Sequence, residues 1–440
     1  MALTAFCGMA QGKTQADQNK LQTASKGMWL WSADADGMVS GETGGPSTGY
    51  LWSGDGRMKA LIFAFQNMNE ETLFASQDFR DAMAKNGVGI LWIAPGFGQE
   101  WDIMQGVQEA FDGLLDKLAA ASGHSELTEI PLIPFGHSAQ ATMPWNFTAW
   151  NPDRTLCLIS YHGDSPRTNL CGFGRSNIEW GRNRNIDGIP ALMVMGEYEW
   201  WDARLRPGMG FRIWYPESCV SFLGDAGRGH FDLGKDTERY LIRFIEKSLD
   251  NRLKEGKLVK IDPKQGWLAP IPDWSEINTT TDIAQAAAWD EYKGNPYESF
   301  WFFDREMAEW ATRRYAETRG KKGSWLNLQT PDGKLASYNP NAHCKVLMEV
   351  TPDKDDIFEL KAVFTDSLRC QKVKDPDRRK AVVHYVSGPA IEIAPGKFKV
   401  DRSHPTWNNP RRRGKITVAA EAPHSATHKA AVQEAEISVL

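Results

Sequence analysis

The sequence predicts an α/β fold on a mostly parallel, doubly wound sheet, followed by a small β-sandwich. Between residues 59 and 252, short apolar runs alternate with segments whose apolar residues recur at helical spacing. Such alternation is typical of parallel strands joined by right-handed helical crossovers. From residue 324 onward the pattern changes to short alternating strands separated by turns, which indicates a β-sandwich. A chain of 440 residues can hold two or three domains of this kind.

The elements of the α/β part follow in order along the chain. Residues 28–56 alternate tryptophan-rich pieces with Gly, Ser and Asp, which predicts a hairpin at the edge of the sheet. Buried strands and amphipathic helices then take turns. The expected strands are 59–65, 88–94, 132–135, 155–161 and 190–195, and the expected helices are 76–86, 104–121, the stretch from the turn at 136–139 to residue 150, and 235–252.

A connecting region, residues 255–323, joins the two parts. It begins with an irregular proline-rich stretch, and apolar residues on one face then predict a helix over 281–319 that packs on the α/β domain. The organisation we expect is a residual signal or disordered leader (1–27), an α/β catalytic domain (28–254), this connection, and a β-sandwich (324–440).

Composition excludes some functions. A formal net charge of −5 offers no electrostatic case for nucleic acid, and no run of about 18 apolar residues could span a membrane. Residues 1–11 resemble the tail of a secretion signal, so a periplasmic or secreted protein is expected. If the chain is exported, Cys157–Cys171 and Cys344–Cys370 are possible disulfides, although buried thiols explain these cysteines equally well.

The stretch most indicative of function is Gly136-His137-Ser138-Ala139, which directly follows the apolar run 132–135. A strand that turns sharply into a helix would hold the Ser138 hydroxyl above the edge of the sheet. Serine is a weak nucleophile alone, so catalysis would also need a histidine base, an acid to orient it, and N–H donors for the oxyanion.

The chain supplies these groups in a familiar order. Gly136-His137-Ser138, then the acidic segment 196–199, then Gly229-His230-Phe231-Asp232 resemble the nucleophile, acid and histidine segments of an α/β-hydrolase over residues 55–250. One position departs from the family pattern G-x-S-x-G, because Gln140 replaces the second glycine. Either the flanking alanines relieve the crowding there, or Gln140 faces the pocket.

The resemblance implies a Ser138–His230–Glu199 triad. Glu199 stands three residues after Gly196, the usual place for the acid, with Asp164 as second choice and Glu197 and Asp202 as further candidates. His230 competes with eight other histidines. Of these, His137 should point away from the serine, and His162 is the main rival.

The oxyanion would be held by backbone N–H groups at two places. One is Ala139, directly after the nucleophile, and the other is the end of the strand 59–65, at Gln66 or Asn67. A plain loop at the strand end is the competing interpretation. No metal or cofactor is implied.

A polar insertion, residues 165–185, lies where this fold places substrate-shaping caps. Its Arg175, Trp180 and Arg182, together with Arg228, would suit a hydrophilic sugar, including an anionic one, because arginine pairs with carboxylates and tryptophan stacks on sugar rings. A solvated surface or structural ion pairs would explain any one arginine equally. Most of the 18 tryptophans are expected in cores.

The whole pattern is similar to esterases of bacterial polysaccharide-degrading systems, and in particular to pectin methylesterases of the α/β-hydrolase type. The resemblance implies an oligosaccharide or polysaccharide partner carrying methyl esters of galacturonic acid. Acetyl or feruloyl esterase, a peptidase of the same fold, and an inactive glycan-binding protein remain alternatives.

Overall fold

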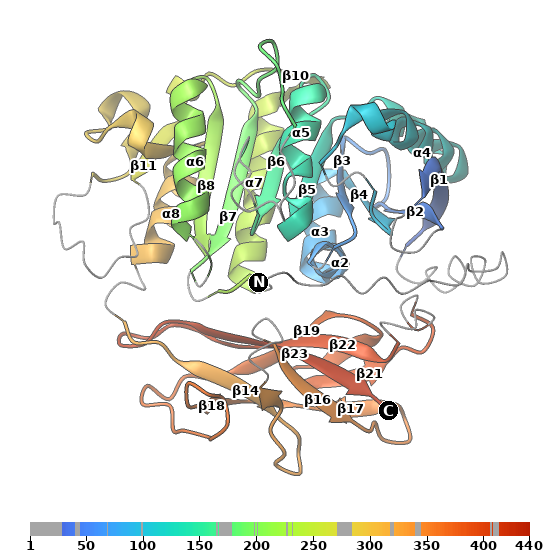
Figure 1. Cartoon of the computed structure of the whole chain (residues 1–440), viewed down its shortest axis with the longest axis vertical. Coiled ribbons are helices and arrows are strands. Elements are labelled where there is room, and N and C mark those ends of the chain that lie inside the picture. Colours follow the sequence, from blue (N-terminus) through green and yellow to red (C-terminus); the bar gives the residue numbers. More distant parts are fainter. Residues whose placement is uncertain are drawn as a thin grey trace, which may run out of the picture.

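The structure is a computed structural model. It describes residues 29–39, 45–67, 69–97, 100–163, 166, 178–197, 199, 201–225, 228–230, 232–270, 284–316, 321–338, 345–404, 407 and 413–440. The expected leader, residues 1–27, lies outside the described residues. Figure 1 shows an α/β domain stacked on a C-terminal β domain.

The α/β domain is built on an eight-stranded sheet in the order β1-β2-β4-β3-β5-β6-β7-β8. β1 and β2 form an antiparallel hairpin at the edge, and all the strands from β4 to β8 in this order are parallel. This mostly parallel sheet confirms the predicted α/β-hydrolase fold class. The strands are β1 Trp31–Val39, β2 Pro46–Trp52, β3 Ala60–Phe65, β4 Val88–Ala94, β5 Leu132–His137, β6 Leu158–Tyr161, β7 Pro190–Gly196 and β8 Cys219–Asp225.

Helices cover both faces of the sheet, and the alternation of side chains along a strand explains why. In β3, Phe63 packs in one core cluster with α4, whereas its neighbour Ile62 packs in the other with α3 and α7. Consecutive buried residues of the strand therefore pack against the helices on opposite faces of the sheet. The helices are α2 Glu70–Ala75, α3 Gln77–Asn86, α4 Val107–Ser122, α5 Met143–Trp150, α6 Trp201–Trp214, α7 Lys235–Arg252 and α8 Arg305–Ala316.

The predicted helix over 281–319 is wrong in its first half. Among the described residues of this range, α8 is the only α-helix, and a small sheet of β12 Ala287–Ala288, β11 Trp267–Pro270 and β13 Ser299–Phe302 precedes it. Every residue of β13 is buried, so its continuous apolar run belongs to a strand covered on both faces. Pro296 also interrupts any helix through this region.

α6 and β8 are among the elements that were not predicted. α6 has Pro207 inside it and an apolar pattern too weak to indicate a helix. β8 lies in a stretch between α6 and α7 for which we predicted no strand, although every one of its residues is buried.

The C-terminal domain consists of β strands around a separate core that includes Leu328, Val418 and Ile437. Its largest sheet has the order β15-β16-β23-β22-β19. The strands are β14 Trp325–Gln329, β15 Ser337–Tyr338, β16 Val346–Val350, β17 Ile357–Glu359, β18 Lys361–Thr365, β19 Val382–Ser387, β20 Ala390–Ala394, β21 Lys397–Val400, β22 Lys415–Ala422 and β23 Ala431–Val439.

The C-terminal domain lies against the edge of the sheet where the parallel strands end. The arrowhead of β7 points toward it in Figure 1, and Lys429 forms an ion pair with Glu197, the residue directly after β7. Arg228, beyond the end of β8, donates to the Glu421 carboxylate of β22 at 2.7 Å. Because α/β sheets bind ligands at this edge, the β domain borders the region where a substrate would enter.

We expect Glu421→Gln to lower the free energy of unfolding by about 1–3 kcal/mol, because Arg228 then loses the charge of its interdomain partner. Arg228 is only 4% exposed, and its next carboxylate, on Asp225, lies at 3.9 Å. Urea unfolding followed by tryptophan fluorescence measures the effect. Asp356→Asn, which weakens the solvent-exposed pair with Arg402, is the control and should change little. Equal shifts in the two variants would contradict the prediction.

Candidate active site

The turn at Ser138 has the geometry of a nucleophile elbow. β5 ends at His137, a short 3-10 turn (η4, Ser138–Gln140) follows, and α5 begins at Met143. Ser138 has a φ of +55°, in the left-handed region that non-glycine residues seldom adopt. A strained serine at a strand-to-helix turn raises its hydroxyl above the sheet, which is the feature that the sequence predicted.

The structure brings the three residues of the predicted triad together. The Ser138 Oγ lies 2.6 Å from the His230 Nε2, and the His230 Nδ1 lies 3.3 Å from the Glu199 Oε1. The three residues follow β5, β8 and β7, which end at the same edge of the sheet. The His230 side chain is 26% exposed and that of Glu199 only 5%, so the relay runs from an accessible hydroxyl to a buried carboxylate.

The Glu199 carboxylate is held by two further groups. Its Oε1 lies 2.8 Å from the His162 Nδ1, and its Oε2 accepts from the Arg204 guanidinium at 3.1 Å. Burial alone would raise the pKa of Glu199, but the neighbouring His162 and His230 lower it to well below its usual range. Glu199 is therefore an ionised carboxylate at neutral pH, as the orienting acid of a triad must be.

The other candidate acids fare differently. The Glu197 carboxylate pairs with Lys429 of the β domain. Asp164 and the side chain of Asp202 lie outside the described residues. Of the candidate acids in the part of the chain that the structure describes, Glu199 is the one in contact with the His230 imidazole.

The rival histidines do not take the place of the base. His137 and His162 are both completely buried, and each directs one ring nitrogen at the backbone carbonyl of His230, at 2.8 and 3.0 Å respectively. His230 is the histidine that meets the Ser138 hydroxyl.

The prediction for the second oxyanion donor is wrong. The Gln66 N–H donates to the Ile93 carbonyl at 2.8 Å, and the Asn67 N–H donates to the Glu70 carboxylate at 3.2 Å, so neither faces an oxyanion freely. Asn67 instead donates from its side chain to the His137 carbonyl at 2.7 Å and thereby braces the elbow. Ala139 lies in the first turn of η4, where backbone N–H groups lack intrahelical partners, and its role as donor stays a prediction.

Glu70 is a site residue that sequence reasoning missed. It is completely buried, and its carboxylate accepts from the backbone N–H of His137 at 2.8 Å as well as from that of Asn67. It therefore ties the loop after β3 to the end of β5. A carboxylate at the start of a helix normally indicates a solvated cap, so the sequence held no sign of this contact.

The departure at Gln140 has a packing explanation. A Cβ on Gly136 would lie 2.1 Å from the Gln140 carbonyl oxygen, and one on Gly163 would lie 1.9 Å from the Ala141 Cβ. The close approach of elbow and sheet is thus accommodated at these two glycines, and position 140 is free to carry a side chain. Gln140 is 3% exposed, so it is buried beside the elbow.

Gly136→Ala should lower kcat/KM by about 100-fold or more, because the added methyl collides with backbone and shifts the nucleophile by a distance on the order of 1 Å. Gly113→Ala is the matched control, since nothing lies within 4 Å of its added Cβ in the middle of α4. The control should be as stable as the parent or more so. An alanine at 136 that leaves kcat/KM unchanged would contradict the elbow geometry.

Of the described residues predicted to bind substrate, Trp180 and Arg228 are held by other parts of the chain. Trp180 is completely buried and donates its indole N–H to the Asn146 side chain at 2.7 Å, so its ring cannot stack on a sugar. Arg228 is committed to Glu421. Arg175 lies outside the described residues. The predictions for Trp180 and Arg228 are therefore corrected, because residues far away in the sequence occupy these two side chains.

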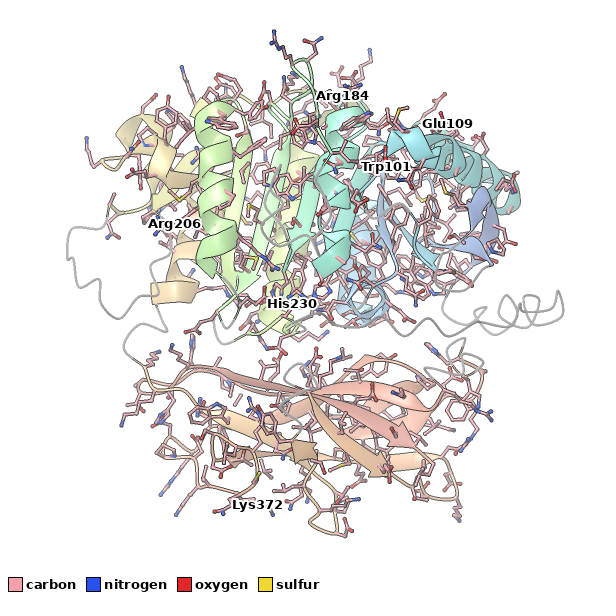
Figure 2. The ribbon with its side chains drawn as sticks, in the orientation of Figure 1. Trp101, Glu109, Arg184, Arg206, His230 and Lys372 are labelled. Carbon is pink, nitrogen blue, oxygen red and sulfur yellow. The ribbon has the colours of Figure 1, made fainter. Side chains whose placement is uncertain are left out.

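Arg182 lies at the wrong end of the sheet for substrate binding. The described part of its segment, 178–189, leads into the first residue of β7, whereas the triad lies where the strands end. Two residues on, Arg184 packs on the Trp150 ring at 4.5 Å, and Figure 2 shows Arg184 at the end of the domain opposite to His230. The described residues 178–185 therefore do not cap the site as predicted, and residues 167–177 of the insertion lie outside the described residues.

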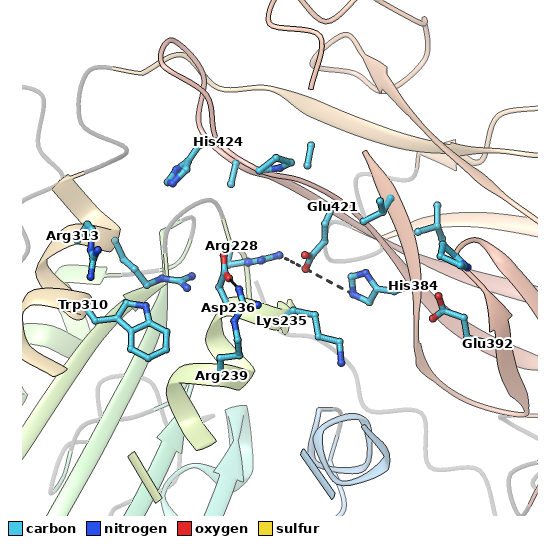
Figure 3. Close-up of a pocket in the computed structure, with 17 residues that line it drawn as sticks. Arg228, Lys235, Asp236, Arg239, Trp310, Arg313, His384, Glu392, Glu421 and His424 are labelled. Atoms are coloured by element: carbon cyan, nitrogen blue, oxygen red, sulfur yellow. Dashed lines mark hydrogen bonds and ion pairs between the residues drawn. The ribbon is translucent and has the colours of Figure 1, made fainter. Parts of the chain in front are cut away.

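A cavity of about 750 Å³ lies between the domains, lined among others by Arg228, Lys235, Trp310, His384 and Glu421. Figure 3 shows Glu421 between Arg228 and His384. The triad does not line this cavity. Several of its basic groups are already neutralised by carboxylates of the chain. These pairs are Arg228–Glu421, Lys235–Glu238, Arg239–Asp236 and Arg314–Asp225.

The cysteine predictions are only partly visible. Cys157 and Cys370 carry free thiols, and their suggested partners, Cys171 and Cys344, lie outside the described residues. Burial raises the pKa of the Cys157 thiol to about 12, which makes it unreactive. Of the helices in the described part of the chain, none is long and apolar enough to cross a membrane.

No family model and no curated protein matches the sequence. Solved structures similar to about half of the chain include an S-formylglutathione hydrolase from Staphylococcus aureus (9% identity, TM-score 0.34, 50% of this chain and 98% of the other). A serine hydrolase without a lid from Xanthomonas campestris (13%, 0.33, 50% and 93%) and a monoglyceride lipase variant from Saccharomyces cerevisiae (11%, 0.33, 52% and 97%) are also similar. At these scores the likeness says nothing about what this chain cleaves.

Proposed function

We propose that the protein is a serine hydrolase that cleaves carboxylic esters. The observation that carries the proposal is the continuous relay in which the Ser138 Oγ lies 2.6 Å from the His230 Nε2 and the buried Glu199 carboxylate lies behind the ring. The strained backbone of Ser138 supports it further, because such strain persists where the surrounding structure imposes it for function.

In this proposal the geometry assigns each step to a residue. The Ser138 oxygen attacks the ester carbonyl while the His230 Nε2 takes its proton, and the imidazolium that forms is stabilised by Glu199. The backbone N–H of Ala139 stabilises the oxyanion. His230 then returns the proton to the departing alcohol, and water hydrolyses the acyl-enzyme by the same steps.

For the substrate we propose ester substituents on plant cell-wall polysaccharide, with the methyl ester of galacturonic acid in pectin first. The support is the resemblance seen in the order of the three catalytic segments and in the C-terminal β domain. The arginines and tryptophan first considered for a uronate do not add to it, because the described ones lie elsewhere or are paired. A pectic substrate would fit an exported protein, in agreement with the signal-like N-terminus.

A panel of methyl-esterified, acetylated and feruloylated oligosaccharides tests the substrate, with Ser138→Ala as the blank. Methanol release from methyl-esterified oligogalacturonate is the expected result. Activity confined to acetyl or feruloyl esters would exclude pectin and retain the esterase. Cleavage of chromogenic dipeptides instead would indicate a peptidase. Affinity for oligosaccharide without fluorophosphonate labelling would indicate an inactive binding protein.

A further inference from the structure

The proposed base, His230, is enclosed by two other histidines. The His137 Nε2 lies 2.8 Å and the His162 Nδ1 lies 3.0 Å from the backbone carbonyl oxygen of His230. A carbonyl oxygen can only accept, so both nitrogens carry a proton and donate. Burial and the neighbouring histidines hold the pKa of His137 well below its usual value, which makes it a neutral donor.

His162 makes a second contact that His137 does not. Its Nδ1 also lies 2.8 Å from the Glu199 Oε1, closer than the 3.3 Å that separates the same oxygen from the His230 Nδ1. The Nδ1 of His162 thus hydrogen-bonds to the main chain of the proposed base and lies in ion-pair contact with the proposed acid. The His162 carbonyl in turn accepts from Arg204 at 3.1 Å, and the same guanidinium nitrogen holds the Glu199 Oε2.

The backbone at His162 is itself unusual. Its φ is +49°, in the left-handed region, as is that of Ser138. Ser138 directly follows β5 and His162 directly follows β6, and these two strands are neighbours in the sheet. The His162 ring stacks on Tyr161 with centroids 4.1 Å apart and an interplanar angle of 6°. A non-glycine residue in the left-handed region costs free energy, so this backbone conformation of His162 must be imposed by the surrounding contacts.

We propose that His162 is a positioning residue of the triad, whose Nδ1–H sets Glu199 and the main chain of His230 in the geometry in which the imidazole meets Ser138. The proposal rests on the proposed function. His162 acts through two other residues and touches neither the hydroxyl nor the substrate. Its effect is on the alignment of the triad, because His162 contacts the Glu199 oxygen that faces the His230 ring, whereas Arg204 holds the other oxygen.

Three substitutions separate this role from simple packing. His162→Asn keeps an N–H donor near the place of the Nδ1. His162→Phe keeps the stacked ring but has no donor, and His162→Gln carries its amide about one bond too far. We expect the Phe and Gln variants to lose about 10- to 100-fold in kcat with KM nearly unchanged, since a hydrogen bond to a charged group is lost, and the Asn variant to lose roughly threefold or less.

His124→Phe is the matched control. The His124 Nδ1 also contacts a buried carboxylate, on Glu126 at 3.0 Å, but this pair lies under the edge hairpin beside Trp31. It should change the melting temperature without changing kcat. Measuring the rate of fluorophosphonate labelling beside ester hydrolysis makes the comparison independent of the substrate chosen.

The outcomes divide cleanly. A parent protein that neither labels nor hydrolyses any ester would overturn the proposed function and this inference with it. An active parent whose folded Phe and Gln variants retain full kcat would overturn the positioning role alone. So would an Asn variant as impaired as the Phe variant, because then only the imidazole volume matters. Should the Phe variant not fold, the Gln and Asn pair decides the question by itself.

Discussion

Replacing Ser138 by alanine should abolish esterase activity, with a loss in kcat on the order of 10⁴- to 10⁶-fold. The reason is that the hydroxyl 2.6 Å from the His230 Nε2 is the group that would form the covalent intermediate. Release of alcohol from the best ester of the substrate panel measures the effect, and fluorophosphonate labelling followed by mass spectrometry should place the adduct on this residue.

A serine elsewhere in the chain provides the control. Ser248 is fully buried in α7 and donates to the Phe244 carbonyl at 2.8 Å, so Ser248→Ala should retain activity and label normally. Turnover undiminished in Ser138→Ala, or labelling that persists there, would leave the proposed mechanism without a nucleophile.

Glu199→Gln should lower kcat by roughly 10³- to 10⁴-fold, because the amide can no longer stabilise the imidazolium or select its tautomer. The loss should extend across the pH–rate profile, because Glu199 is ionised in the parent over that range and the amide carries no charge. The measurement is kcat/KM between pH 4 and pH 9, an interval of about the size needed to see both limbs.

In the parent protein the same profile tests the charge of Glu199. Its pKa in the folded protein lies well below its usual range, so the carboxylate stays ionised as the pH falls from 8 to about 5. Activity lost over that interval therefore does not come from protonation of Glu199. Glu197→Gln is the matched control for Glu199→Gln, because the Glu197 carboxylate pairs with Lys429 and not with His230. A larger loss in the Glu197 variant would reassign the acid.

Local patterns account for the parts that could be predicted. The apolar run before Gly136-His137-Ser138 indicated a strand that ends in a sharp turn, and β5 and the left-handed Ser138 have that form. The nucleophile and acid segments follow the predicted strands 132–135 and 190–195, whose ends meet at one edge of a parallel sheet, whereas the strand before the histidine segment, β8, was not predicted. Helix 235–252 was likewise evident, since its apolar residues keep a strict helical spacing.

The failures share a cause, which is a partner far away in the chain. The Asn67 N–H was expected at an oxyanion, but the Glu70 carboxylate that also braces His137 occupies it. Trp180 was predicted to stack on a sugar, but it is buried in the core and donates its indole N–H to Asn146. His162 was weighed only as a competing base, because nothing near it in sequence shows that it lies against Glu199.

The α/β class, the elbow and the residue types available for catalysis could be predicted from the chain alone, because periodicity and turn chemistry are local properties. Only the tertiary structure shows which carboxylate lies behind His230, that Arg184 lies at the end of the sheet opposite to the triad, and that the β domain borders the catalytic edge. Those outcomes depend on burial and on pairs such as Arg228 and Glu421, which are 193 residues apart. Periodicity and turn signals depend on a few neighbouring residues, so they do not predict such pairs.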